Sequence, residues 1–304
     1  MELEINLAKL FFVNNFNEET AENSFEFQSP KIPPSGEEEP TPNNPPWNSI
    51  VAFGVWLASV AFIILIPNLL ILPYVARQKI DFLDKDKLLE FVTTDKTAVL
   101  LQVSAIGFAH LLTVALAWLV ITKFNKFSFR QVLGWRWGGF TFWKCVLILG
   151  GFFAVAGITS YFIPEKDNEL LKIIRSSREA LYLVAFLATF SAPLIEEVIY
   201  RGILYSAFQK TFGVALAILF VTIVFAGVHI PQYYPSYSTI VLICLLSLIL
   251  TLIRVWTGNL LPCIVLHTLF NGIQSFGLVL QTFLPPNSDP TIEPAAFVII
   301  HLLK

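Results

Sequence analysis

Charged residues are scarce in this sequence. Asp, Glu, Lys and Arg fill 14% of its 304 positions, whereas roughly 25% is usual in a soluble domain. A soluble protein of this length could not coat its core with so few polar side chains. The net charge is only −2, and no stretch forms the basic stripe typical of nucleic-acid binders. The composition therefore excludes an ordinary soluble domain and predicts no nucleic-acid partner.

Cysteine is also scarce. The three cysteines, Cys145, Cys244 and Cys263, all lie in apolar stretches, and none belongs to a CxxC pair. This pattern argues against a disulfide framework and against a thiolate metal site. We interpret all three as small buried hydrophobic residues.

The N-terminus lacks the basic region of a secretory signal peptide, because it begins MELEINLAKLFF with acidic residues in that place. The first long apolar stretch is therefore expected to remain as a membrane anchor. Residues 1–49 are acidic and rich in Pro and Asn. Such a segment buries too little apolar surface to offset its ordering entropy, so we predict a disordered tail.

Long apolar runs dominate the rest of the chain. A bilayer crossing needs about 20 mostly apolar residues. Seven segments meet this requirement: residues 50–75, 97–122, 142–163, 180–209, 211–230, 237–253 and 255–284. Residues 295–303 are too short to cross alone unless the residues before them contribute. The runs lack the alternation of barrel strands. The predicted fold is an all-α polytopic transmembrane helical bundle with seven to eight spans.

Three clusters of polar residues interrupt these apolar runs. They read EEVIYRG at 196–202, FAGVH at 225–229 and HTLFN at 267–271. Ionisable residues inside a span are costly and are functional-site hypotheses by default. The clusters are therefore the candidate site.

The first cluster carries two adjacent acids and a base. Glu197 and Arg201 are four residues apart with the acid first, which favours an ion pair on one helix face. Glu196 points about 100° away around the helix. We predict that Arg201 holds Glu197 and leaves Glu196 free to act as a general base, since two close carboxylates raise one pKa.

The positions of the histidines predict different roles for them. His267 and Asn271 are four apart and share a helix face, and His229 belongs to a separate motif on another span. We interpret His110 as a core residue bonded to a backbone carbonyl, and His301 as a surface or tail residue. Helical rise places Glu196 and the three motif residues at interior depths, within about three turns of one another.

The group contains no nucleophilic Ser or Cys with an obvious base, so activated water is the natural chemistry. In one version Zn²⁺ or another divalent metal is held by Glu196, His229 and His267. In the other version no metal takes part. Glu196 and His229 deprotonate the water, while His267 and Asn271 stabilise the oxyanion. Asn is a poor zinc ligand and a good oxyanion donor, which slightly favours the metal-free version.

The three motifs, in this order on three apolar helices, resemble the EExxxR, FxxxH and HxxxN motifs of a known family. It is the CAAX protease and bacteriocin-processing family of intramembrane proteases, also called Abi or type II CAAX prenyl endopeptidase-like. The resemblance covers roughly residues 180–276. It implies site roles for seven residues: Glu196, Glu197, Arg201, Phe225, His229, His267 and Asn271. Among these, Arg201 and Phe225 are expected to be supporting residues.

The resemblance implies an intramembrane endopeptidase, in a family often named as metalloproteases. Its partners are expected to be the lipid bilayer and a peptide or protein substrate that is membrane-associated or lipidated. We predict N-terminal transmembrane helices at 50–175 and a catalytic core at 176–304. In a prokaryotic host the expected location is the plasma (inner) membrane. Two alternatives stay open: a proton-coupled transporter and a non-catalytic membrane scaffold or immunity protein.

Overall fold

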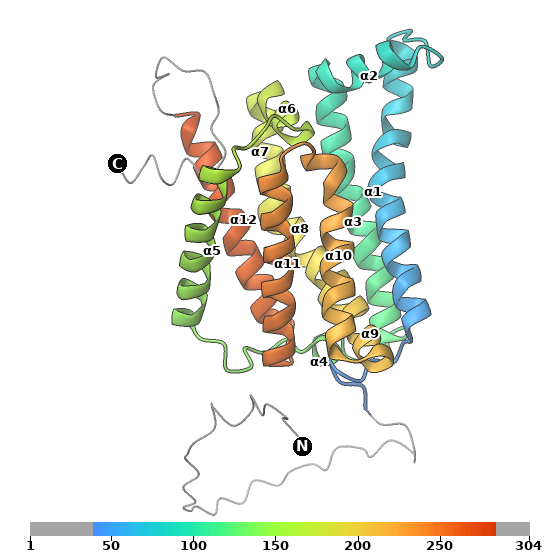
Figure 1. Ribbon diagram of the computed structural model, residues 1–304. Helices are drawn as coiled ribbons and strands as arrows, with labels where there is room; N and C mark the ends of the chain where they lie inside the picture. The colour runs from blue at the N-terminus through green and yellow to red at the C-terminus, as the bar shows by residue number, and fades with distance from the viewer. Residues whose placement is uncertain (1–38, 284–304) are drawn as a thin grey trace, which may run out of the picture. The chain divides into compact units, whose positions relative to one another are not determined.

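Seven long apolar helices make up the bundle (Figure 1), in a computed structural model that describes residues 39–283. They are α1 (Ser49–Arg77), α3 (Lys96–Thr122), α5 (Phe142–Phe162), the composite segment Arg178–Phe212, α10 (Val214–Tyr233), α11 (Tyr237–Thr257) and α12 (Leu261–Gln281). The prediction of seven spans in an all-α fold is confirmed for the described residues. The doubtful eighth span at 295–303 lies outside them, as does His301.

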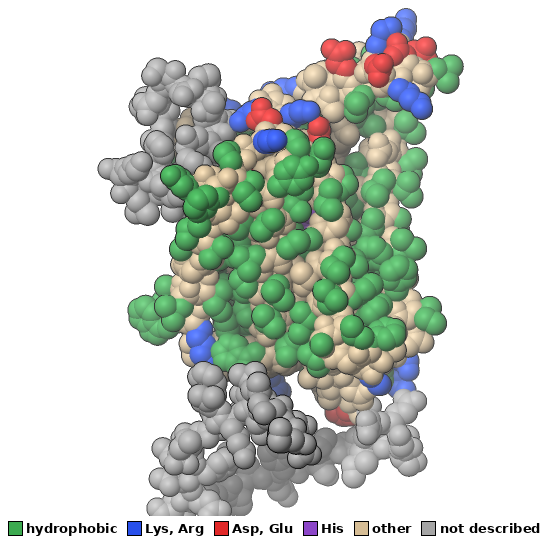
Figure 2. All heavy atoms as spheres, viewed as in Figure 1, with side chains coloured by type: hydrophobic (Ala, Val, Ile, Leu, Met, Phe, Trp, Pro, Cys, Tyr) green, Lys and Arg blue, Asp and Glu red, His purple; other side chains and the backbone are tan. Residues whose placement is uncertain are grey.

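The lateral surface of the bundle is apolar. Figure 2 shows hydrophobic side chains covering the visible side of the helices, with acidic and basic side chains gathered at the two ends. Ile64 on α1 is 56% exposed, and Leu111 on α3 is 68% exposed. Water-soluble proteins rarely expose continuous apolar surface of this extent. The chain is therefore an integral, multi-pass membrane protein.

Three short helices lie at the ends of the bundle and were not predicted from the sequence. They are α2 (Lys85–Thr94), α4 (Phe129–Leu133) and α6 (Glu169–Ser176). Asn168 caps the start of α6, and its side chain accepts the backbone N–H of Leu171. Leu171 and Ile174 are the buried residues of this amphipathic helix. Helices α2 and α6 lie at one end of the bundle and α4 at the other (Figure 1).

The composite fourth span changes helix type along its length. It consists of α7 (Arg178–Phe186), the π-helix η2 (Leu187–Ser191), α8 (Ala192–Glu197), the π-helix η3 (Val198–Leu204) and α9 (Tyr205–Phe212). π-helical turns are rare and are frequent at functional sites. Here they flank the α8 segment that carries both acids of the first motif.

The π-helix η3 runs through the main hydrophobic core. Every residue from Val198 to Leu204 is buried. Its apolar side chains pack with residues of α1, α3 and α10, including Ala52, Ile121 and Val221. The acids at the end of α8 are therefore held on a rigid, fully packed element.

Residues 39–48 pack against the end of the bundle that carries α4 and α9. The Trp47 ring is buried, and its Nε1 donates to the Ile203 carbonyl at 3.1 Å. Arg254 on α11 donates to the Asn43 side chain at 3.0 Å and to the Pro42 carbonyl at 2.6 Å. The predicted tail at 1–49 is therefore wrong for this part, because an aromatic ring and backbone acceptors find partners. Residues 1–38 lie outside the described residues.

Candidate active site

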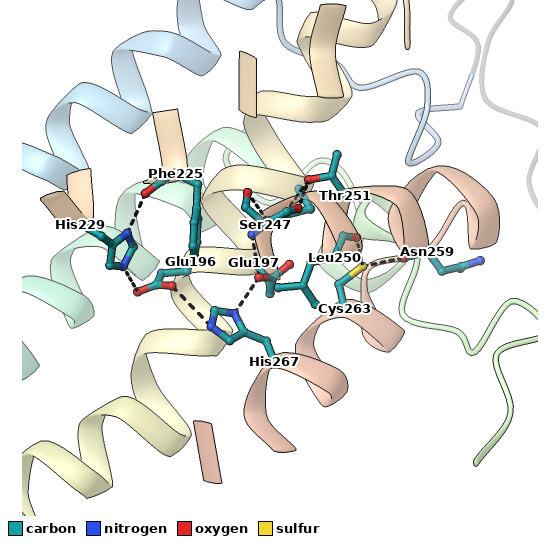
Figure 3. A network of polar contacts seen from close by, with 11 residues as sticks. Glu196, Glu197, Phe225, His229, Ser247, Leu250, Thr251, Asn259, Cys263 and His267 are labelled. Carbon is teal, nitrogen blue, oxygen red and sulfur yellow. Dashed lines mark hydrogen bonds and ion pairs between the residues drawn. The ribbon is translucent and has the colours of Figure 1, made fainter. Parts of the chain in front are cut away.

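Glu197 lies at the centre of a buried polar network (Figure 3). Its Oε1 accepts from Arg201 Nη1 at 2.9 Å and from His267 Nδ1 at 2.8 Å. The Glu197 and Arg201 side chains are both fully buried. The ion pair predicted from their spacing is thus present. Glu197 also joins the first motif on α8 to the third motif on α12.

Two hydroxyl residues on α11 complete the hydrogen bonding of Arg201. Its Nη2 donates to the Ser247 carbonyl and hydroxyl at 2.9 and 2.8 Å, and its Nε donates to Thr251 Oγ1 at 3.2 Å. A buried ion pair needs such extra hydrogen bonds to offset its desolvation. Neither residue was predicted from the sequence to belong to the site. The feature that could have indicated them is a pair of hydroxyl residues four positions apart, which share one face of an apolar helix.

Glu196 is the neighbour of Glu197, yet its carboxylate lies in a different place. Oε1 is 4.0 Å from His229 Nε2, and Oε2 is 3.8 Å from His267 Nε2. The side chain is 22% exposed, whereas Glu197 is fully buried. Figure 3 shows the Glu196 carboxylate between the two imidazole rings. The structure therefore brings Glu196, His229 and His267 together and leaves Glu196 accessible.

The hydrogen bonds of each imidazole fix which nitrogen carries a proton. His229 Nδ1 lies 2.7 Å from the Phe225 carbonyl, which can only accept, so Nδ1 donates. His267 Nδ1 donates to the Glu197 carboxylate in the same way. When either ring is neutral, its Nε2 atom carries a lone pair directed at the Glu196 region.

Phe225 supports the site with its ring as well as with its carbonyl. Its ring centroid lies 4.7 Å from the Arg201 guanidinium carbon and 4.7 Å from the His229 ring centroid. The contact with Arg201 has cation–π geometry, which is favourable in a desolvated setting. Phe225 is itself buried. The second motif therefore places one residue against both the ion pair and an imidazole.

Asn271 lies one turn beyond His267 on α12. Its Nδ2 donates to the Ala188 carbonyl in the π-helix η2 at 2.8 Å. An amide nitrogen carries two hydrogens, so one N–H is left for another acceptor. Asn271, His267, His229 and Glu196 all line one cavity of about 250 Å³. The four side chains proposed from three distant motifs thus face the same space.

A comparison with protein families agrees with this geometry. Residues 178–273 match the family model of type II CAAX prenyl endopeptidase Rce1-like proteins. The chain carries a CAAX prenyl endopeptidase-like domain. The match spans about a third of the chain and confirms the resemblance that the three motifs indicated. No curated protein and no solved structure matches the chain significantly. The general class that follows is a membrane endopeptidase.

Two polar residues near the endopeptidase-like site come from outside the matched segment. His110 on α3 shares a 2.7 Å hydrogen bond with the Ser191 hydroxyl in η2, and it is buried. Its partner is therefore a side chain and not the backbone carbonyl that we expected. Glu165, in the loop after α5, lines the same cavity as Glu196. Neither residue belongs to one of the three motifs, so neither was predicted to lie near the site.

Glu165 lies at the edge of the membrane-spanning part, in surroundings that affect its ionisation. Burial is the largest influence and holds the pKa of its carboxyl above the ordinary value, although a hydrogen bond from Thr239 and the charge of Arg175 lower that pKa in part. The Thr239 hydroxyl donates to Glu165 Oε1 at 3.2 Å. This hydrogen bond connects the loop after α5 to the start of α11.

The endopeptidase-like site offers metal ligands of a suitable kind but not in a suitable arrangement. Two neutral imidazoles and a carboxylate suit Zn²⁺, and His267 has the carboxylate partner that metal-binding histidines usually have. Among the described residues, however, no group of three or more His, Cys, Asp and Glu side chains has an arrangement that could hold a metal ion. The side chains as placed do not fit a metal, and we derive no step through one.

Proposed function

We infer that the protein hydrolyses a peptide bond with water activated by Glu196 and His229. The observation that supports this most directly is the position of the Glu196 carboxylate between two imidazole Nε2 atoms, at 4.0 and 3.8 Å. These separations exceed a direct hydrogen bond and suit a bridging water. A carboxylate close to such a water is placed to act as its general base.

The proposed reaction proceeds by addition and elimination. Glu196 takes a proton from the water, His229 Nε2 accepts a hydrogen bond from it, and the water oxygen attacks the peptide carbonyl carbon. The carbonyl π electrons move to oxygen and form an oxyanion. When the C–N bond breaks, the proton held by Glu196 passes to the leaving nitrogen. The products are a carboxylic acid and an amine, so all atoms of the water are accounted for.

The oxyanion is proposed to be stabilised by His267 and Asn271. His267 Nδ1 already donates to Glu197, so donation from Nε2 requires the doubly protonated, cationic ring. Asn271 contributes the N–H that does not bind Ala188. Donors fixed in a cavity in this way are usually the largest single contribution to catalysis of acyl transfer.

The substrate that fits this setting is a membrane-associated peptide or protein, because the site lies within an apolar bundle. We propose a lipidated substrate as one form of it. In a prokaryotic host the protein would act in the plasma membrane.

A cleavage assay on purified protein in lipid vesicles tests the proposal. A library of membrane-associated peptides supplies the substrate, and mass spectrometry identifies the products. Glu196→Ala and His229→Ala should each lower kcat by about 10²-fold or more, as removal of a general base does. Glu169→Gln is the matched control, because this acid is half exposed on α6 and pairs with Lys172. Equal product from the wild type and both site variants would defeat the mechanism.

A chelator experiment separates the two versions of water activation. The proposed version predicts that the rate is unchanged after chelation and that purified active protein contains no stoichiometric metal. Loss of activity on chelation, with recovery on adding Zn²⁺, would replace direct activation by Glu196 with a metal-assisted mechanism. Metal content measured on Glu196→Ala and His267→Ala would then identify the ligands.

A further inference from the structure

The cavity of the proposed active site contains a second carboxylate, far from the motifs in sequence. Glu165 and Glu196 both line it, and none of the described lining residues is Lys or Arg. The phenol of Tyr233 lines the cavity as well. The described lining of the cavity thus includes two acids and no Lys or Arg, and its basic side chains are those of His229 and His267.

The lining of the cavity combines polar and aromatic side chains. Its polar residues besides the two acids include Ser160, Asn168, Gln232, Tyr233, Thr239 and Gln274. Its aromatic residues include Phe152 and Phe153, which contact Phe270. A ligand in this cavity therefore meets both apolar surface and the two carboxyl groups.

The charge of Glu165 is only partly compensated within the protein. Thr239 donates to one of its oxygens at 3.2 Å. Arg175 is near enough to act on it, but Arg175 does not line the cavity and donates to Asp167 at 2.7 Å. A partly buried carboxylate gains most from a cation that enters the same low-dielectric space.

We propose that Glu165 forms a specificity subsite that binds a cationic side chain, Lys or Arg, of the peptide substrate. This inference rests on the proposed endopeptidase function and adds a substrate preference to it. A cation at this position pairs with Glu165 while the peptide bond lies beside Glu196. An anionic group at the same position is repelled by Glu165 and meets no Lys or Arg among the described lining residues.

The test uses a peptide that the wild-type protein cleaves in the vesicle assay. Lys, norleucine and Glu are placed in turn at each position within four residues of the cleaved bond, and kcat/KM is measured. At one position the Lys peptide should be cleaved about tenfold faster than the Glu peptide, or more, as expected for opposite against like charge in a cavity. Glu165→Gln should bring that ratio close to one, and Glu165→Lys should invert it.

The ratio of two peptides is used because any loss of folded protein lowers both rates equally. Two further variants separate a charge effect from a change in the loop. Glu169→Gln removes a nearby acid outside the cavity and should keep the preference for Lys. Thr239→Val removes the hydrogen bond to Glu165 but keeps its charge, and should also keep the preference.

Three results would overturn the inference. A wild-type protein that cleaves Lys, norleucine and Glu peptides equally at every position has no charge subsite, although its endopeptidase function stands. A preference for Lys that persists in Glu165→Gln places the subsite elsewhere. If the wild type cleaves no peptide at all, the proposed function fails and this inference fails with it.

Discussion

Glu196 and Glu197 are adjacent in sequence, but their carboxylates have different surroundings. Glu197 is buried against Arg201 and His267, whereas Glu196 faces the cavity. About 100° of helical rotation separates neighbouring side chains, so one side chain can face a partner helix while the next faces an open space. A fixed ion pair and an accessible acid therefore arise from two consecutive residues.

The pairing of Glu197 with Arg201 could be predicted from the sequence, but its contact with His267 could not. Residues four apart on one helix are neighbours whatever the fold. Contact between α8 and α12 depends on how each helix is rotated and tilted, which the periodicity of one helix does not determine. The contacts of Ser247 and Thr251 with Arg201 could not be predicted for the same reason, because they depend on how α11 packs against η3. The rise along a helix restricts only how deep a residue lies in the membrane, and not which neighbouring helix its side chain faces.

The buried ion pair allows a prediction about stability and activity. Arg201→Met keeps the volume but leaves the Glu197 carboxylate buried without a cation. Breaking such a pair costs about 3–5 kcal/mol, so the free energy of unfolding measured in detergent should fall by this amount. Cleavage activity should be lost, because the uncompensated acid no longer holds its position toward His267.

The double variant Glu197→Gln/Arg201→Met is the control for this prediction. It removes both charges, so part of the lost stability should return. Activity should stay low, because His267 Nδ1 then lacks a carboxylate acceptor. A double variant no more stable than Arg201→Met would show that the ion pair is not what stabilises this region.

At the scale of whole helices, the apolar spans were predictable and the short elements were not. A bilayer requires a minimum run of apolar residues, which is visible in composition alone. The π-helices η2 and η3 have no such compositional signal, because their wide turns depend on packing with neighbouring helices. Helix α6 has only eight residues, too few to cross a bilayer, so a search for long apolar runs does not detect it. The N-terminal segment 39–48 was misread because its Pro and Asn content is typical of disorder.

The docking of the N-terminal segment gives the second prediction. Trp47 is buried and donates to the Ile203 carbonyl in η3. Trp47→Ala should lower the free energy of unfolding by about 3–5 kcal/mol, the usual cost of removing a large buried ring. Trp47→Phe keeps most of the ring and loses one hydrogen bond, so its cost should be about 1 kcal/mol. Thermal or denaturant unfolding in detergent measures both.

Trp143 supplies the matched control, since its ring is 71% exposed on α5. Trp143→Ala should change stability in detergent by less than about 0.5 kcal/mol. A similar loss in Trp47→Ala and Trp143→Ala would mean that segment 39–48 does not contribute to the folded bundle.

At the scale of the whole molecule, the side surface of the bundle is apolar and suits contact with lipid, whereas the polar side chains of the candidate site lie in the interior. Most residues of the long helices face outward, which is why composition alone predicted the membrane setting. The polar residues of the three motifs instead face inward, onto one cavity. Costly intramembrane charges are kept where partners or a ligand can compensate them. This division predicts that a new charge is tolerated at the ends of the bundle and not on its side.

Ile64 and Leu83 allow that prediction to be tested with one type of substitution. Ile64 lies near the middle of α1 and is 56% exposed, whereas Leu83 lies between α1 and α2 and is 90% exposed. Ile64→Arg should cost about 2.5–3.5 kcal/mol, as Arg does at the centre of a membrane helix, and should reduce the yield of inserted protein. Leu83→Arg should cost less than about 0.5 kcal/mol. Yield and unfolding in lipid vesicles measure both, and equal behaviour of the two variants would contradict the assignment of α1 as a lipid-facing span.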